Sequence, residues 1–399
     1  MEGECFLKVH LLLTLMELKE VLENYNPHWF SEVKPKGIPR QRYLKVLEKE
    51  LKEKRITFLV GLRRIGKTTL LKHFISFLQH SIEPTRILYL SLDHPLLQKH
   101  NLGDVIREFR KMNEISRKEK VYVFLDEIMY VENAFQWLKV LHDSENIKIY
   151  ATSSSSLNLK DKKAFLTGRH ITIRVKPLSF SEYLIFRGKK TKEPHLLERY
   201  FEEYLRDGGI PEYVLSRDAS YLVGLAEDII ARDIGSQANI SNLLKLTELF
   251  LLLVSHTGKM ITYSKLSKLL GIKQETVEQY ISYLTSSELV HLVYRWAKSF
   301  NERVYSPKKV YLGDVGFRYA LTGKYSSGSN LENLVFLDIM EKEPFYYFEK
   351  GVEIDFITKS KEVFECKLRE INENQKRVLE KFKRRGYKIH IVRGYRDFI

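Results

Sequence analysis

The sequence contains little cysteine, tryptophan and proline, and it has no long uninterrupted apolar run. Two cysteines, Cys5 and Cys366, cannot build a disulfide framework, and no Cys/His group has the spacing of a zinc site. No stretch approaches the ~20 apolar residues of a membrane span. The apolar segment 6–16 is interrupted by Lys8 and His10 and lacks a basic leader, so we expect an amphipathic docking helix there and no signal peptide. These features favour a cytoplasmic protein that acts away from membranes.

Positive charge is plentiful and unevenly distributed. The 399 residues, enough for several domains, carry a net charge of +15. Residues 244–310 hold ten Lys/Arg against five Asp/Glu, and residues 361–399 hold twelve against six, so these two segments supply excesses of +5 and +6. This distribution favours DNA as a polyanionic partner. The alternative is a solubilising basic surface.

A phosphate-binding motif gives the clearest functional signal. Residues 61–68 read G-L-R-R-I-G-K-T, between an apolar run at 56–60 and a helix-like stretch at 69–79. Gly61 and Gly66 let the backbone turn tightly, so that its N–H groups point at phosphate oxygens. Lys67 is expected to reach the β- and γ-phosphates, and Thr68 to bind Mg²⁺.

An acidic pair follows a second buried-strand pattern. Residues 121–125 are continuously apolar and end in Asp126 and Glu127. We expect Asp126 to hold Mg²⁺ and Glu127 to orient and deprotonate the attacking water, which distinguishes a hydrolase from a mere nucleotide binder. The alternative is a strand that simply ends in solvent.

Further strands alternate with helices around these motifs. Strands are expected at 87–90 and 147–152, and helices at 105–115 and 133–142, which predicts a parallel three-layer α/β sheet. Thr152 or Ser153, at the tip of the last strand, is a polar residue in the place of a γ-phosphate sensor. A serine-rich turn over 153–156 is the alternative.

The first basic segment has helix-turn-helix spacing. Helices are expected at 244–255, 263–270 and 274–286, with Gly271 in the turn, followed by strands at 290–296 and 304–312 that would form a winged β-hairpin. Four polar residues of the third helix would face a DNA groove, namely Gln274, Thr276, Gln279 and Tyr283. Such a module also serves protein–protein contacts, and the pattern leaves both uses open.

The last segment contains an ordered set of charged residues. Glu332 lies in a helix-like stretch at 331–341, Asp355 in a strand-like stretch at 351–356, and Glu365 and Lys367 in another at 363–367. A helix glutamate, a strand aspartate and Glu-x-Lys on the next strand form the constellation of metal-dependent nucleases. A nuclease-like fold with a structural ion network and no cleavage is the alternative.

Several motifs between about Ile38 and Lys367 occur together. They are residues 61–69, 125–127, 166–169 (LTGR), 177–184 (PLSFSEYL), 208–211 (GGIP), 310–316 (VYLGDVG), 331–333, 352–356 and 365–367. With this set the chain resembles a family of AAA-type ATPases, common in archaea and bacteria, that join an ATPase domain to a winged helix and a restriction-endonuclease-like domain of the PD-(D/E)xK kind. One departure is Ala151-Thr152-Ser153-Ser154, which replaces the Thr-Gly-Ser usual in that family.

The resemblance implies ATP and Mg²⁺ as cofactors and extends the set of site residues. The expected ATP-binding residues are Gly61, Arg64, Gly66, Lys67, Thr68, Thr69 and Thr152, and the expected catalytic residues are Lys67, Glu127 and Arg169. Arg169, with Arg64 as a second candidate, would stabilise charge at the γ-phosphate. The residues are equally consistent with an arginine that acts in its own chain and with one that acts on a neighbouring copy in a homo-oligomer.

The sequence therefore predicts five segments and two alternative functions. The segments are an N-terminal helical segment (1–37), a P-loop ATPase domain (38–173), a helical lid (174–242), a winged helix (243–312) and a nuclease-like domain (313–399). The leading expectation is ATP hydrolysis coupled to a conformational change on DNA, with nuclease activity left open. The alternative is an ATP-controlled switch that binds a protein partner and carries an inactive nuclease-like domain.

Overall fold

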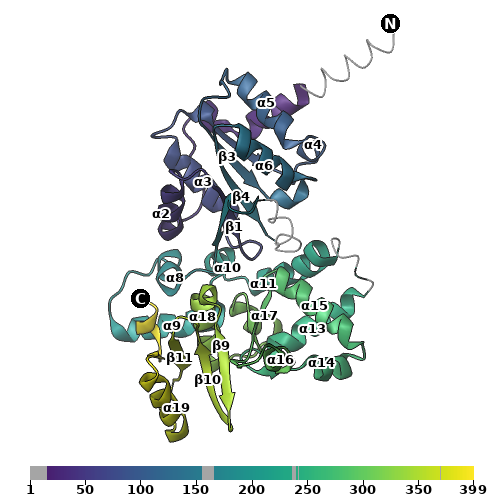
Figure 1. Cartoon of the computed structure of the whole chain (residues 1–399). Helices are drawn as coiled ribbons and strands as arrows, with labels where there is room; N and C mark the ends of the chain where they lie inside the picture. The colour runs from purple at the N-terminus through teal and green to yellow at the C-terminus, as the bar shows by residue number, and fades with distance from the viewer. Residues whose placement is uncertain (1–15, 155–165, 236–239, 241, 369) are drawn as a thin grey trace. The chain divides into compact units, whose positions relative to one another are not determined.

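The computed structural model describes residues 16–154, 166–235, 240, 242–368 and 370–399. Most of the expected docking helix at 6–16, and Cys5, lie outside these residues. The chain divides into two compact units (Figure 1): unit 1 comprises residues 1–61 and 66–175, and unit 2 comprises residues 62–65 and 176–399. The short stretch Leu62–Ile65 is thus the only part of unit 2 that precedes residue 176.

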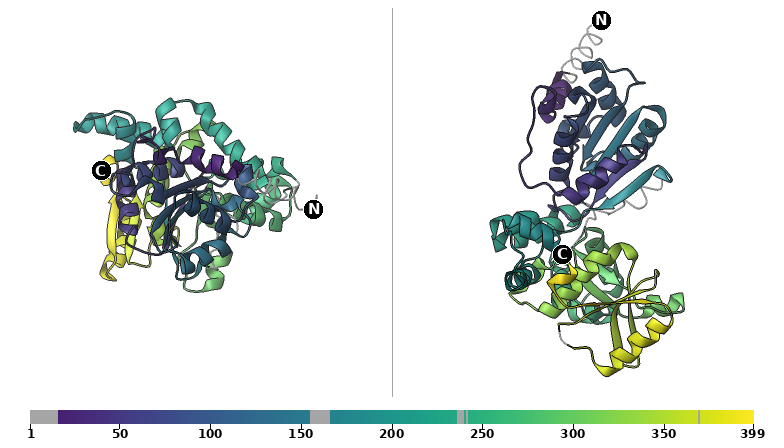
Figure 2. Two further views of the ribbon diagram at one scale, coloured as in Figure 1. Left: turned by 90° about the horizontal axis from the view of Figure 1, so that it is seen from above. Right: turned by 90° about the vertical axis from the view of Figure 1, so that its left-hand side faces the viewer.

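Unit 1 is built on a five-stranded parallel sheet in the order β2-β3-β4-β1-β5. The strands are β1 (Ile56–Val60), β2 (Ile87–Ser91), β3 (Val121–Asp126), β4 (Ile147–Ser153) and β5 (His170–Arg174), and the helices are η1 (Pro27–Trp29), α2 (Gln41–Glu50), α3 (Lys67–Leu78), η2 (Pro84–Arg86), α4 (Pro95–Gln98), α5 (Leu102–Met112), η3 (Ile128–Tyr130) and α6 (Ala134–Ser144). Helices lie on both faces of the sheet (Figure 2). The central strands β1 and β4 are therefore buried along their whole length, as expected for a parallel sheet that is covered on both faces.

Aromatic residues fill the space between the sheet of unit 1 and its helices. On one face, Phe74 of α3 contacts Phe124 and Tyr150 edge-on at ring-centroid distances of 6.1 and 5.3 Å. On the other, Phe58 of β1 stacks on Phe135 of α6 at 5.8 Å. Such ring pairs contribute about 0.5–1.5 kcal/mol each beyond their burial, and they fix both layers to the strands that carry the acidic and phosphate-binding residues.

The segment before α2 covers the edge strand β2. Residues 16–25 are helical, and the buried side chain of Asn26 follows. Its Oδ1 accepts a hydrogen bond from Tyr89 N at 2.6 Å, and its Nδ2 donates to Tyr89 O at 3.0 Å. Nearby, the Trp29 indole donates to Ile87 O at 2.7 Å. These side chains occupy backbone groups that an open sheet edge would leave free.

Unit 2 begins with helices and continues into a small antiparallel sheet. The helices are α8 (Phe180–Phe186), α9 (Pro194–Asp207), α10 (Pro211–Ser216), α11 (Ala219–Asp228), η5 (Ile229–Gly235), α13 (Leu243–Ser255), α14 (Tyr263–Leu270), α15 (Gln274–Ser286) and α16 (Phe300–Tyr305), and the strands are β6 (Met260–Ile261), β7 (Val290–Val293) and β8 (Lys308–Leu312) in the order β6-β8-β7. The expected helices at 263–270 and 274–286 are found with those bounds. The expected hairpin strand at 304–312 is shorter, because Val304 and Tyr305 end the helix α16.

A mixed four-stranded sheet, β12-β11-β10-β9, completes unit 2. Its elements are α17 (Gly316–Thr322), α18 (Ser327–Ile339), η6 (Met340–Lys342), β9 (Phe345–Glu349), β10 (Val352–Ile357), β11 (Glu362–Cys366), α19 (Glu373–Arg384), β12 (Lys388–Val392) and η7 (Tyr395–Asp397). The two strand-like stretches that carry Asp355 and Glu365 are neighbours, β10 and β11, and they pair antiparallel. A helix, α18, carries Glu332, as expected.

Candidate functional site

The phosphate loop turns through two glycines with positive φ. Gly61 has φ 150° and Gly66 has φ 96°, conformations that side chains with a Cβ rarely adopt. The helix α3 begins directly after Gly66, so Lys67, Thr68 and Thr69 form its first turn. The buried Lys67 ammonium donates to Gly61 O at 3.0 Å, across the loop. The loop thus presents an ammonium group and the N-terminus of a twelve-residue helix to the same place, as a phosphate site requires.

Three hydroxyl groups converge on the carboxylate of Asp126. Thr68 Oγ1 lies 2.6 Å from Asp126 Oδ2, Tyr89 Oη lies 3.0 Å from the same oxygen, and Thr152 Oγ1 lies 2.5 Å from Oδ1. The middle of β2, the ends of β3 and β4, and the start of α3 supply these groups. A hydroxyl and a carboxylate held together at a phosphate loop are oxygen ligands of the type that Mg²⁺ prefers, so Thr68 and Asp126 fit the ion.

Glu127 adopts a backbone conformation that is unusual for its residue type. Its φ is 56° and its ψ 55°, and its N–H donates to Thr152 Oγ1 at 2.9 Å. Its carboxylate accepts hydrogen bonds from the hydroxyl and the N–H of Ser154, the latter at 3.3 Å. A non-glycine residue in this region costs energy, and such residues are enriched at functional sites. The strained turn places Glu127 beside Asp126 at the carboxyl edge of the sheet.

The polar residues at the tip of β4 have different partners. Thr152 is fully buried, and its hydroxyl binds the acidic pair as described above. Ser153 is buried as well, whereas Ser154 binds Glu127. The expectation that Thr152 or Ser153 senses the γ-phosphate stays a prediction. In this structure Thr152 orients Asp126 and Glu127.

Arg63 and Arg64 of the loop belong to unit 2 and have partners within that unit. Arg63 forms an ion pair with Asp233 of η5, and the Arg64 guanidinium lies over the ring of Tyr221 at 5.9 Å. All four residues belong to unit 2. Arg64 has a left-handed φ of 60°. Its expected contact with the γ-phosphate stays a prediction.

Arg169 lies at the start of β5, far from the loop in its own chain. Strands β1 and β5 are parallel, with Ile56 opposite His170 and Val60 opposite Arg174, so Arg169 precedes the first rung while the phosphate loop follows the last. Five residues of strand span roughly 17 Å. The Arg169 guanidinium instead forms two hydrogen bonds with Asp143, at 2.9 and 3.1 Å, and these hold the pKa of the Asp143 carboxyl well below its usual range. This arrangement does not bring Arg169 to the loop of the same chain; action on a neighbouring copy stays a prediction.

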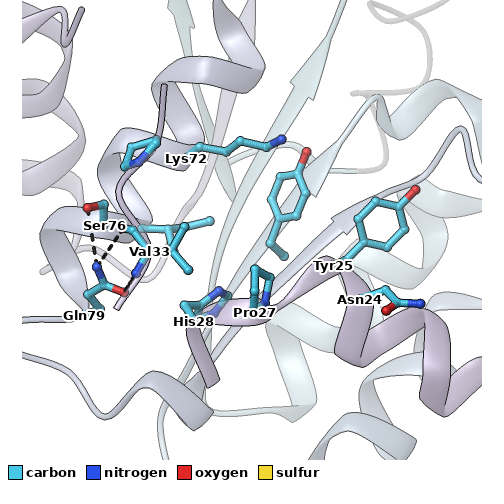
Figure 3. Close-up of a pocket in the computed structure, with 11 residues that line it drawn as sticks. Asn24, Tyr25, Pro27, His28, Val33, Lys72, Ser76 and Gln79 are labelled. Carbon is cyan, nitrogen blue, oxygen red and sulfur yellow. Dashed lines mark hydrogen bonds between the residues drawn. The ribbon is translucent and has the colours of Figure 1, made fainter. Parts of the chain in front are cut away.

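A cavity of about 200 Å³ in unit 1 lies beside the phosphate-loop helix. Residues of the segment before α2 and of the exposed side of α3 line it, among them Tyr25, His28, Lys72 and Gln79 (Figure 3). His28 contacts Ile87 O at 3.0 Å and Gln79 donates to Val33 O at 3.0 Å, so both side chains already have partners. The cavity contains none of the expected ATP-binding residues, and Tyr89 is its link to Asp126.

Unit 2 holds a second cluster of charged residues. Ligand oxygens of Glu332, Glu353 and Asp355 lie within 4.8 Å of one another. Lys367 Nζ lies 3.3 Å from Glu365 Oε1, and the N–H of Asp355 lies 3.3 Å from Glu365 Oε2. The structure therefore brings together the four residues of the expected nuclease set. It adds Glu353 to them.

A buried ammonium group, that of Lys309 in β8, lies among these carboxylates. Its Nζ is 2.5 Å from Glu332 Oε1, 2.5 Å from Glu353 Oε1 and 3.5 Å from Asp355 Oδ1. Burial, and next the charge of Asp355, raise the pKa of Glu332 to about 7 and that of Glu365 to about 8. Raised carboxyl pKa values are typical of closely spaced, desolvated acids.

The four expected DNA-contacting residues lie on the outer side of α15. Gln274 and Gln279 are exposed, and Thr276 and Tyr283 are half-buried, whereas Val277 and Leu284 are buried as predicted. Gln274 donates to Glu278 Oε1 at 3.0 Å and Gln279 donates to Tyr283 Oη at 2.7 Å. The helix carries two glutamates and no lysine or arginine, which is unfavourable for a helix in a DNA groove.

Sequence reasoning missed four residues that the structure places at the two sites. They are Tyr89 and Ser154 at the acidic pair, and Lys309 and Glu353 in the cluster of unit 2. Glu353 had a signal, because it shares a strand face with Asp355. Lys309 lies about twenty residues before Glu332, and no spacing rule connects the two.

Two family models and several known proteins match parts of this chain. Residues 53–184 match a family model described as AAA domain, and residues 198–327 match one described as a domain of unknown function (DUF8612). An uncharacterized protein of Haemophilus influenzae is 27% identical over 338 residues, which cover 81% of this chain and 84% of that protein. An uncharacterized protein of Methanocaldococcus jannaschii is 28% identical over 381 residues, which cover 87% and 83%. A solved Walker-type ATPase of Pyrococcus abyssi superposes with a TM-score of 0.44 at 16% identity, over 73% of this chain and 99% of that one.

The AAA match covers the strands and loops that form the first site. It includes the phosphate loop, Asp126, Glu127 and Thr152. Together with the parallel sheet, it gives this part of the chain the fold of a P-loop nucleoside triphosphatase and supports ATP binding and hydrolysis. A P-loop ATPase fold implies a nucleotide cofactor and usually Mg²⁺. Among the residues that the structure describes, no helix is both long and apolar enough to cross a membrane.

Proposed function

We propose that the chain hydrolyses ATP with Mg²⁺ and couples hydrolysis to a conformational change on DNA. The observation that carries the ATPase half is the 2.6 Å contact between Thr68 Oγ1 and Asp126 Oδ2 beside the Lys67 ammonium. Thr68 and Asp126 would hold the ion, Lys67 would bind the β- and γ-phosphates, and Glu127 would accept the proton of the attacking water. Mg²⁺ would neutralise charge that develops on the transferred phosphoryl group.

Ser154 holds the Glu127 carboxylate and leaves it able to accept a hydrogen bond from water. The carboxylate accepts hydrogen bonds from both polar groups of Ser154. A water molecule in line with the γ-phosphate needs at least one of those carboxylate oxygens as acceptor. In the proposed mechanism Ser154 therefore orients Glu127, and each carboxylate oxygen keeps one lone pair with which to accept that water.

The assignment of the tip of the phosphate loop to unit 2 supports coupling between ATP hydrolysis and a conformational change. Backbone residues 62–65 form the tip of the phosphate loop yet belong to unit 2, where Arg63 pairs with Asp233 in the π-helical element η5. Helices of this kind occur frequently at functional sites. Nucleotide that reshapes the loop would act directly on the Arg63–Asp233 pair, and we propose that this pair transmits the change.

DNA binding is supported by α19 more than by α15. Arg377, Lys381, Arg384 and Arg385 are exposed and, with Glu380, line a hollow in this surface. None of these four cations forms an ion pair with another described residue. Unpaired, exposed cations at the spacing of one helix face suit phosphate oxygens. We name these four residues, three in α19 and Arg385 directly after it, the α19 basic face and propose that DNA phosphates bind there.

Steady-state ATP hydrolysis by the full chain tests the proposal. Lys67→Ala should abolish nucleotide binding, whereas Glu127→Gln should retain binding and lower kcat by about 10²-fold or more, since general-base catalysis typically contributes 10²–10⁴-fold. Glu132→Gln, an exposed neighbour, is the matched control. Normal turnover by Glu127→Gln would refute the assignment of the base. Stimulation by duplex, branched or single-stranded DNA that disappears in Glu127→Gln would support the coupling.

A protein-partner switch is the second candidate function. The observation that favours it is the lack of positive charge on α15, together with the internal hydrogen bonds of its polar residues. In that case DNA would leave the rate of ATP turnover unchanged, and ATP would change the mass of the complex that the chain forms with its protein partner. A DNA mobility shift that weakens steeply with salt would count against this candidate. Cleavage of DNA that survives Lys67→Ala and is lost in Asp355→Ala would instead establish nuclease activity.

A further inference from the structure

The carboxylate cluster of unit 2 already contains a cation. The ammonium of Lys309 contacts oxygens of Glu332 and Glu353 at 2.5 Å each, and its side chain is only 1% exposed. Three carboxylates that share so little space repel one another strongly unless a positive charge lies between them. The ammonium supplies that charge, so the cluster is a built cation site and more than a group of acidic residues.

We infer that Lys309 is the resident cation of this cluster, and that a divalent metal ion and the Lys309 ammonium are alternative occupants of one site. Mg²⁺ or Mn²⁺ would need oxygens at about 2.0–2.2 Å, drawn from the same three carboxylates that surround the ammonium. The two positive charges would then lie almost in contact in a desolvated place, which is unfavourable. The metal enters only when the lysine leaves.

The backbone around Lys309 is held in place. Two residues further along β8, Tyr311 donates to Glu332 Oε1 at 2.6 Å. At the end of the strand, Leu312 N donates to Asn333 Oδ1 at 2.7 Å, and Asn333 Nδ2 donates to Leu312 O at 2.9 Å. Since β8 is fastened to α18 by these bonds, Lys309 leaves the cluster only if its side chain turns away or β8 separates from α18.

This inference concerns the nuclease-like part of the proposed function and is independent of ATP hydrolysis. It explains how this domain can keep the residues of a metal-dependent nuclease while the Lys309 ammonium occupies the carboxylates that would bind the metal. In this state the domain does not cleave nucleic acid. Movement of β8 would convert the cluster into a metal site.

Binding of Mn²⁺ to the full-length, nucleotide-free protein tests the inference, with MnCl2 alone as the probe. Lys309→Met removes the ammonium and keeps the apolar stem; Lys308→Met is the matched control, since Lys308 lies next to it and bonds Val304 O outside the cluster. We expect Lys309→Met to bind Mn²⁺ at least tenfold more tightly than wild type or Lys308→Met. Its melting temperature should rise with MnCl2, because a ligand of the native state stabilises that state. Adding Asp355→Asn to Lys309→Met should remove both effects.

Two results would overturn the inference. One is a folded Lys309→Met protein that binds Mn²⁺ no better than the Lys308→Met control. The other is an Asp355→Asn protein, with Lys309 intact, that binds one Mn²⁺ fewer than wild type. According to the inference, wild type holds no metal at the cluster, so this substitution should remove none. The comparison of Asp355→Asn with wild type remains decisive even if Lys309→Met does not fold. Equal Mn²⁺ binding by these two proteins supports the inference. ATP turnover by Lys309→Met reports on the first site separately.

Discussion

At the scale of single residues, the orientation of Asp126 is the most closely determined feature of the nucleotide site. Its two carboxylate oxygens accept hydroxyl hydrogen bonds from Thr68, Tyr89 and Thr152. Burial and the charge of Asp126 raise the pKa of Tyr89, so Tyr89 remains a donor at every ordinary pH. A carboxylate with this many fixed donors loses little rotational entropy when Mg²⁺ binds.

Tyr89→Phe should therefore raise the Mg²⁺ concentration that ATP hydrolysis requires, while the phenyl ring keeps the packing of the tyrosine. It removes one hydrogen bond to a charged group, an interaction worth about 1.5–3 kcal/mol. We expect about tenfold more Mg²⁺ for half-maximal ATP turnover, at nearly unchanged ATP affinity, measured by hydrolysis against free Mg²⁺. Tyr122→Phe in β3 serves as the control, since its hydroxyl is remote from Asp126. Superimposable Mg²⁺ curves for Tyr89→Phe and wild type would show that the tyrosine only packs.

Sequence reasoning identified the residues of this site that a local pattern encodes. The loop and the Asp126–Glu127 pair follow from spacing along the chain, because each is a short segment at the end of one strand. Tyr89 and Ser154 come from two other strands, and only the lateral order of the sheet brings them to the pair. Arg169 was expected near the phosphates by resemblance, and the parallel register of β1 and β5 places it at the other end of the strands.

At the scale of elements, strands and long helices were predictable, and the short helix was not. Buried parallel strands are continuous apolar runs, and α14 and α15 have a turn glycine between them, so pattern and structure agree. The six-residue helix α16 was expected to be partly strand. A signal was present, since Ser299 Oγ accepts a hydrogen bond from Glu302 N at 3.0 Å in an N-cap, and a serine three residues before a glutamate indicates a helix start.

The proposed DNA contact belongs to α19 and can be tested there. Replacing Arg384 and Arg385 with glutamate should lower DNA affinity at least tenfold in 100 mM salt and reduce the slope of log affinity against log salt by about two, since each phosphate contact contributes about 0.7–0.9 to that slope. Lys190→Glu/Lys192→Glu, with the same change in net charge at exposed sites, is the control. Fluorescence anisotropy with labelled duplex measures both. Equal losses in both variants would assign the effect to overall charge and exclude a specific face.

At the scale of the whole molecule, the chain divides into two compact units, and the five segments expected from the sequence stay a prediction. The boundary after residue 175 lies close to the expected end of the ATPase domain at 173, and the three expected C-terminal segments fall in one unit. Buried polar bonds connect them within unit 2: Asp314, after β8, accepts from Gly209 N at 2.7 Å and from Gly316 N at 2.8 Å. A Cβ on Gly208 would lie 1.9 Å from Asp314, so the approach requires glycine. Such long-range bonds are not visible in local sequence patterns.

Asp314 should make the stability of unit 2 depend on pH. Burial raises its pKa from 3.8 to about 7, against opposing backbone hydrogen bonds from Gly209 and Gly316 and with a further rise from Asp207. Since the folded pKa exceeds the unfolded one, its contribution is complete below about pH 4 and is lost as pH rises towards 7. The slope is at most about 1.4 kcal/mol per pH unit.

Urea unfolding between pH 4.5 and 7.5 measures this dependence. Asp314→Asn should be less stable than wild type at every pH in this range, because an amide N–H would face a backbone N–H. Its free energy of unfolding should nevertheless lack the pH dependence that Asp314 contributes. Asp338→Asn, at the exposed end of α18, is the control and should keep the wild-type slope. Parallel curves for wild type and Asp314→Asn would show that Asp314 does not titrate in this range.

The amide of Asn26 has a consequence for the behaviour of the protein in concentrated solution. By pairing with both backbone groups of Tyr89, it takes the place that the strand of another chain would occupy at β2. With Leu at this position, the N–H and C=O groups of Tyr89 would be unpaired and open to an extended segment of another chain, which favours edge-to-edge aggregation. Together with the Trp29 indole on Ile87 O, this side chain keeps the sheet from acting as a template for other chains, and colloidal stability, more than folding, is what its loss would change.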